Sequence, residues 1–174
     1  LVEALDAQRN LPYGFTASKI MSTPSHNIMN LLQRSVLMLY ADDPKAEERS
    51  FEHEISTAIS LISRLPRIMV LAHYAKRAAF YNESMIMHRF IPGQSTSETI
   101  LSMLRPNREF TPEEARMLDI MMSLHAEHGG GNNSTFTCRV LSSADTDPYA
   151  AYAAAIGSLK GSKHGGANHK VLAM

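Results

Sequence analysis

The sequence predicts an all-α protein built from a packed set of helices. Apolar residues recur every three or four positions along most of the 174 residues, a spacing typical of helices that bury one face. No stretch sustains an alternation of apolar and polar residues, and no hairpin signal such as Asn-Gly is present. Capping residues, prolines and glycines divide the chain into separate helices.

The first predicted helix follows Pro24, and Ser25 can cap it. The run 51–81 predicts either one long helix or two shorter ones, because Pro66 should kink or break it. Its second half, 68–80, is apolar on most sides and is therefore expected to be buried. The apolar stripe of the first helix is formed by Ile28, Leu32, Val36 and Leu39.

The second half of the chain predicts helices with clear start and stop signals. Thr111-Pro112-Glu113-Glu114 places a capping Thr, a proline at the first helical position and a Glu three residues after the cap. Three glycines, 129–131, end that helix. Asp147 can cap an Ala-rich helix that Gly161 can stop. The predicted helices cover 95–104, 112–128, 134–143, 148–160 and a last segment beginning near His164.

The composition is that of one soluble globular domain. Hydrophobic residues make up 44% of the chain, and 17 Lys and Arg balance 17 Asp and Glu. With zero net charge, we expect neither nucleic acid nor an anionic membrane as a partner. The single cysteine, Cys138, excludes an internal disulfide and a cysteine-based zinc site, and is typical of a cytoplasmic protein.

No segment predicts a membrane span or a signal sequence. The longest charge-free apolar stretch, 149–159, is shorter than the about 20 residues that cross a bilayer. The chain begins without Met, and residues 170–174 continue an apolar helical pattern without a stop signal. We therefore expect a chain that is cut at both ends.

Glycine and histidine concentrate in one part of the chain. Seven of the nine Gly and four of the eight His lie between His125 and His169. Glycine lets a backbone approach a ligand closely, and His transfers protons near neutral pH. We therefore expect the functional site in two segments, 125–134 and 161–168.

The first segment brings an imidazole, an amide and a hydroxyl to one turn. His125 and His128 lie three residues apart at a helix C-terminus and project to the same side, where the helix dipole favours a cation. Asn132 and Ser134 open the next helix. This arrangement suits a small polyanion. A glycine-capped helix end with buried histidines explains the same spacing, above all for His125.

The second segment places His164 at the start of a helix, among Gly161, Gly165 and Gly166. The positive end of the helix dipole disfavours a protonated His there. A neutral imidazole can donate a hydrogen bond to a carbonyl oxygen on which negative charge develops. A capping or surface histidine beside a flexible turn explains the pattern equally well.

Together these segments resemble the citrate synthase family, which includes the 2-methylcitrate synthases. The resemblance rests on His-Ala-Glu-His-x3-Asn-x-Ser-Thr at 125–135, an Ala-rich helix after Asp-Pro-Tyr at 147–149, and Lys-His-Gly-Gly-Ala-Asn at 163–168. Order and spacing agree over 91–174, and Glu48-Arg49-Ser50 is similar to an earlier region of the family.

The resemblance implies an acyltransferase that condenses acetyl-CoA with oxaloacetate through an enol, then hydrolyses the thioester to citrate and CoA. It implies that His164 is catalytic and donates a hydrogen bond to the thioester carbonyl. His128 would bind oxaloacetate, and Asn132 and Ser134 would support the substrate and orient the catalytic His. His125 is expected to be structural. No metal and no cofactor are expected, because acetyl-CoA is a substrate.

The resemblance also implies the organisation of the protein. Residues 1–160 would form part of a large helical domain, and residues 161–174 the truncated start of a small one. The helices 112–128 and 134–144 would pack across a homodimer interface. The family's second catalytic His, its catalytic Asp and the Arg residues that bind oxaloacetate have no positions in this chain. We therefore expect the chain alone to be inactive and to expose apolar surface.

Three alternatives stay open. A non-catalytic relative could keep the helical scaffold and bind a dicarboxylate. A helical metalloprotein could use the clustered His and Glu127 as ligands, although the spacing is not His-Glu-x-x-His. A 2-methylcitrate synthase would use propionyl-CoA, and Gly129 and Ser162-Lys163, which differ from the family's common pattern, leave that choice of acyl-CoA open.

Overall fold

The computed structural model describes residues 2–126 and 131–167, which form helices and no strand. The predicted all-α class is confirmed. In chain order the elements are α1 (Val2–Gln8), the π-helix η1 (Thr16–Met21), α2 (Ile28–Leu39), the 3-10 helix η2 (Tyr40–Asp42), α3 (Phe51–Tyr81), α4 (Thr96–Leu104), α5 (Pro112–Ala126), α6 (Asn133–Ser142), α7 (Pro148–Leu159) and the 3-10 helix η3 (Gly165–Ala167).

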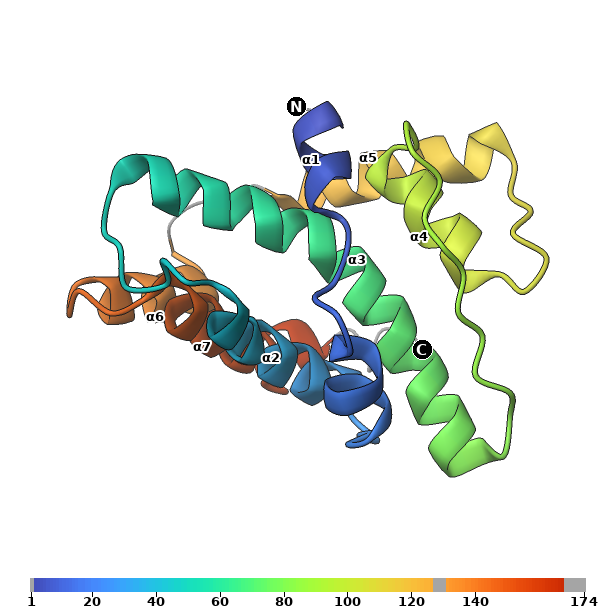
Figure 1. The fold of residues 1–174 in the computed structure, drawn as a ribbon, viewed down its shortest axis with the longest axis horizontal. Coiled ribbons are helices and arrows are strands. Elements are labelled where there is room, and N and C mark those ends of the chain that lie inside the picture. Colours follow the sequence, from blue (N-terminus) through green and yellow to red (C-terminus); the bar gives the residue numbers. More distant parts are fainter. Residues whose placement is uncertain (1, 127–130, 168–174) are drawn as a thin grey trace.

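The long helix α3 runs through the middle of the structure (Figure 1). Helices α2, α6 and α7 lie together on one side of it, and α1, α4 and α5 lie on the other. The core between α2, α3 and α7 holds side chains with almost no exposed surface, so apolar burial there stabilises the packing of α7 on α2. Its fully buried members include Leu31, Val36, Leu39 and Ile68.

Helix α3 continues through Pro66, so the alternative of two shorter helices is wrong. Pro66 is buried, and packing on both sides of α3 offsets the backbone hydrogen bond that proline cannot donate. Ser50 caps the start of the helix, with its hydroxyl accepting from the backbone N–H of His53, and Asn82 in the left-handed conformation caps its end.

By length and composition alone, α3 could cross a membrane. A search for charge-free apolar stretches misses this helix, because Arg64 and Arg67 interrupt its apolar sequence. Half of its most apolar window is buried within the protein, and the core helix of a soluble protein has the same property. The length of α3 is therefore weak evidence for a membrane span.

Local capping signals locate several helix starts correctly. Thr111 forms the capping box that the sequence predicts, and Asp147 caps α7 as predicted. Ser95 also forms a capping box, with Glu98, at the predicted start of α4. Helix α2 differs, because its cap is Asn27 rather than Ser25. Helix α6 begins one residue before the predicted start, and of the helix expected near His164 the described residues contain only η3.

Helix α1 and η1 have no counterpart in the sequence prediction. Both are short, and tertiary contacts hold them in place. Arg9, which follows α1, is buried and donates hydrogen bonds to the side chain of Thr99 and the carbonyl of Gln94. Asp6 pairs with Arg9 at 2.7 Å and accepts from the backbone N–H of Gly93. The N-terminal segment is thereby fixed to α4.

Glu114 joins the start of α5 to the end of α4. Its two carboxylate oxygens accept from the guanidinium of Arg105 at 2.5 and 2.9 Å, and one of them also accepts from the backbone N–H of Thr111. The hydrogen bond from Arg105, followed by that from Thr111, lowers the pKa of Glu114 to about 2 from its ordinary value of 4.5.

This lowered pKa predicts how stability depends on pH. A carboxylate with a depressed pKa stabilises the folded state above pH 4.5, and this contribution disappears as the pH falls towards about 2. We expect the Tm of the wild type to fall more steeply over this interval than that of Glu114→Gln, as measured by thermal unfolding. The neighbouring exposed Glu113→Gln is the control and should follow the wild type. Equal slopes for Glu114→Gln and the wild type would contradict the prediction.

Candidate active site

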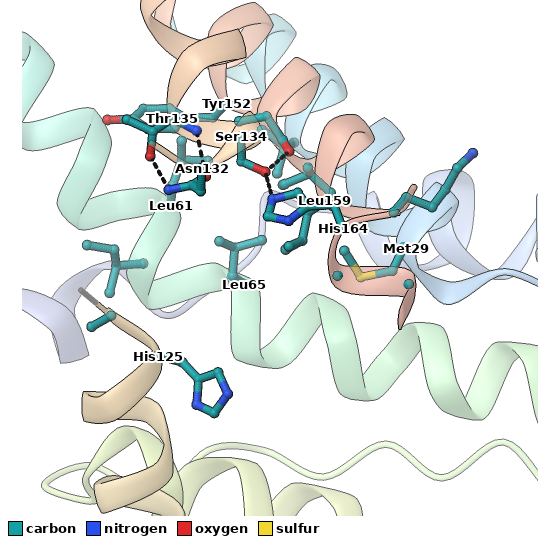
Figure 2. Close-up of a pocket in the computed structure, with 18 of the residues that line it drawn as sticks. Met29, Leu61, Leu65, His125, Asn132, Ser134, Thr135, Tyr152, Leu159 and His164 are labelled. Atoms are coloured by element: carbon teal, nitrogen blue, oxygen red, sulfur yellow. Dashed lines mark hydrogen bonds between the residues drawn. The ribbon is translucent and has the colours of Figure 1, made fainter. Parts of the chain in front are cut away.

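A cavity of about 1000 Å³ lies between α2, α3, α6, α7 and the C-terminal end of α5 (Figure 2). Two walls of different character enclose it. The apolar wall includes Met29, Val36, Leu61, Ile62, Leu65, Ile156 and Leu159. The polar groups include His125, Asn132, Ser134, Arg139 and His164. A cavity with apolar walls and a few convergent polar groups is the usual form of a small-molecule site.

The two segments singled out in the sequence meet at this cavity. Ser134, in the first turn of α6, lies with its hydroxyl oxygen 2.9 Å from Nε2 of His164. The same oxygen lies 3.0 Å from the backbone carbonyl oxygen of Ala155 in α7. Figure 2 shows these contacts. Thirty residues separate Ser134 from His164 in the sequence, and the packing of α6 against α7 brings them together.

The Ser134 hydroxyl determines which nitrogen of His164 carries the proton. It has one proton and two possible acceptors, the carbonyl of Ala155 and Nε2 of His164. When the hydroxyl donates to Ala155, Nε2 must be protonated and donate to it. When it donates to Nε2, the neutral ring carries its proton on Nδ1. Only the second arrangement leaves the ring an N–H that can donate to a ligand.

Glycines around His164 allow the chain to turn tightly after α7. A Cβ atom on Gly165 would lie 2.6 Å from the carbonyl oxygen of Leu159, and one on Gly166 would lie 2.8 Å from that of Gly161. The backbone N–H groups of His164 and Gly166 both donate to Gly161. These glycines therefore serve a close approach of backbone to backbone, whereas the sequence suggested an approach of backbone to ligand.

Asn132 caps α6 at the edge of the cavity. Its side-chain oxygen accepts from the backbone N–H of Thr135 at 2.9 Å, and its amide nitrogen donates to the Thr135 hydroxyl at 2.6 Å. Asn132 thus fixes the start of the helix that carries Ser134. The predicted contact of Asn132 and Ser134 with a substrate stays a prediction.

His125 lies at the end of α5 and lines the cavity with an exposed side chain. The alternative that this histidine is buried on an apolar helix face is therefore wrong. Its Nδ1 donates to the carbonyl of Met121, four residues earlier, at 2.6 Å. This bond directs Nε2 away from the helix backbone. His128, predicted to bind oxaloacetate, lies outside the described residues.

Within residues 2–126 and 131–167, no three His, Cys, Asp or Glu side chains are placed to hold a metal ion. Glu127, His128 and His169, which the metalloprotein hypothesis needs, lie outside that part of the chain. The apolar wall from α2 and α3 was not predicted, because an amino-acid sequence does not reveal which helix faces meet. The helical scaffold and the contact between Ser134 and His164 define the class: an all-α protein with a histidine in a largely apolar small-molecule cavity.

Comparison with known proteins identifies the family. Residues 1–174 match the family described as "Citrate synthase, C-terminal domain". A citrate synthase from Deinococcus radiodurans is 36% identical over 146 residues, covering 84% of this chain and 37% of that relative. A citrate synthase from Acidithiobacillus ferridurans is 34% identical over 98% of this chain and 43% of its own length.

A 2-methylcitrate synthase from Corynebacterium glutamicum is also 34% identical, over 83% of this chain and 37% of its own length. The chain belongs to the citrate synthase family, as the sequence predicted. It spans 37% to 43% of the length of these three relatives.

Proposed function

We propose that the whole protein is a citrate synthase-type acyltransferase that condenses acetyl-CoA with oxaloacetate and releases citrate and CoA. The observation that carries this proposal is the hydrogen-bond distance between Ser134 and His164 at the wall of a large cavity. Membership of the family and the citrate synthases among its relatives support the same reaction.

In this proposal His164 acts as a hydrogen-bond donor to the thioester carbonyl. As a base removes a proton from the acyl methyl group, negative charge develops on the carbonyl oxygen, and an N–H placed there stabilises the enol. For this role the Ser134 hydroxyl must donate to Nε2, 2.9 Å away, rather than to the carbonyl of Ala155, so that the neutral ring carries its proton on Nδ1. The enol carbon then attacks the ketone of oxaloacetate, and water cleaves the resulting thioester.

Oxaloacetate-dependent release of CoA, followed with a thiol reagent, tests this proposal on the whole protein. We expect release only when both substrates are present. Tight binding of oxaloacetate without turnover would instead favour the non-catalytic relative. The same assay on residues 1–174 alone tests the further expectation that this chain is inactive by itself.

We also propose that the protein acts in the cytoplasm, without a cofactor, as a homodimer. Exposed apolar side chains on two consecutive helices of the predicted interface support a second copy as partner, because such surface favours association. On α5 they are Met117, Ile120, Met121 and Leu124, and on α6 they are Phe136 and Val140.

Charged substitutions in this surface should therefore dissociate the dimer. Leu124→Glu combined with Phe136→Glu places two charges on side chains that are 72% and 63% exposed. We expect sedimentation velocity to detect monomers at protein concentrations at which the wild type is dimeric. Tyr13→Glu is the matched control, since Tyr13 is fully exposed but lies outside α5 and α6. A monomeric wild type would contradict the proposed dimer.

A further inference from the structure

Apolar side chains from three helices line the cavity together with His164, in addition to polar residues such as Ser134. Leu159 is the last residue of α7, Leu65 lies on α3 and Met29 lies on α2. All three line the cavity together with His164. In Figure 2, the imidazole of His164 lies between Leu65 and Leu159. A ligand that forms a hydrogen bond with this imidazole therefore also contacts apolar side chains.

Leu159 is attached most directly to the turn that carries His164. Its Cδ1 lies 2.6 Å from the point where a Cβ on Gly165 would be, so it contacts the residue directly after His164. The Leu159 side chain nevertheless remains 39% exposed and lines the cavity. The same side chain thus contacts the His164 turn and faces any ligand beside it.

We infer that Leu159 sets the length of the acyl chain that the site accepts. This inference rests on the proposed function, in which His164 binds the thioester carbonyl. The acyl carbons next to that carbonyl then lie beside the ring, and each added methylene needs space against the apolar wall. Hydrocarbon walls of leucine and methionine contain no polar group that a longer acyl chain would leave unpaired.

A hydrophobic pocket distinguishes chains that differ by one methylene by about 10- to 200-fold at most, and only where the pocket is closely filled. The pocket needs to be closely filled only next to His164, where Leu159 contacts the turn, and not in the rest of the cavity of about 1000 Å³. The side chain of Leu159 then controls how much room remains next to His164.

The test is the ratio of kcat/KM for propionyl-CoA to that for acetyl-CoA, measured with saturating oxaloacetate. In the whole protein, Leu159→Ala should raise this ratio about 10-fold, and the milder Leu159→Val should raise it less. A ratio does not depend on the fraction of folded enzyme, so partial unfolding of a variant does not obscure the result. Leu104→Ala is the matched control, because Leu104 ends α4, is 37% exposed and does not line the cavity.

The outcomes separate this inference from the proposed function. An unchanged ratio in both Leu159 variants, with both thioesters consumed, overturns the role of Leu159 and leaves the acyltransferase intact. An equal rise in Leu104→Ala overturns that role as well, since the ratio would then respond to any shortened leucine at a helix end. Failure of the wild type to release CoA from either thioester overturns the proposed function and the inference together.

Discussion

His164→Ala should lower kcat of the whole protein by about 100- to 1,000-fold while leaving the fold intact. The imidazole is placed to donate to an oxygen that becomes negative only as the reaction proceeds, and loss of one such donor has this effect in other enzymes. Its loss should affect the transition state far more than the bound substrate, so kcat and kcat/KM should fall together. Steady-state kinetics with both substrates measure this effect.

The matched control is His88→Ala. Like His164, His88 is half-buried and uses Nε2 for a hydrogen bond, in its case to the carbonyl of Arg105 at 3.1 Å, but it lies outside the cavity. We expect this variant to keep its activity even if its Tm falls. A rise in KM with unchanged kcat in His164→Ala would contradict the catalytic role, because it would mean that the ring contributes equally to ground state and transition state.

Local chemistry explains which parts of the fold were predictable. The capping boxes at Ser95 and Thr111 involve residues three positions apart, so the sequence contains the whole interaction. The short α1 depends on Arg9, whose partner Thr99 is 90 residues away. The uninterrupted course of α3 through Pro66 depends likewise on packing against other helices.

The candidate site also has parts that the sequence predicts and parts that depend on helix packing. His164 and Ser134 were identified from residue types and from resemblance to the family, and the structure brings the two side chains within 2.9 Å. Their distance depends on the packing of α6 on α7, which no local pattern specifies. The contribution of Leu65 was missed for the same reason, because its position on an apolar helix face is equally typical of a core residue.

Gly165→Ala should disable the site although it adds only one methyl group. The new Cβ would lie 2.6 Å from the Leu159 carbonyl oxygen, too close for any real contact, and that oxygen belongs to the backbone of α7. Either the last turn of α7 or the turn carrying His164 must move. Displacement of a catalytic group by about 1 Å can lower activity about 100-fold, and we expect a loss of this size together with a lower Tm.

Gly131→Ala makes the same chemical change at the other segment of the site, where a Cβ would meet no atom within 4 Å. It should therefore retain wild-type activity and Tm. Circular dichroism melting and the CoA-release assay on both variants separate the possible causes. Lost activity with an unchanged Tm in Gly165→Ala would mean that the turn moves while α7 stays in place. Full activity in Gly165→Ala would contradict the role of this close contact in positioning His164, because the imidazole would then reach the substrate without it.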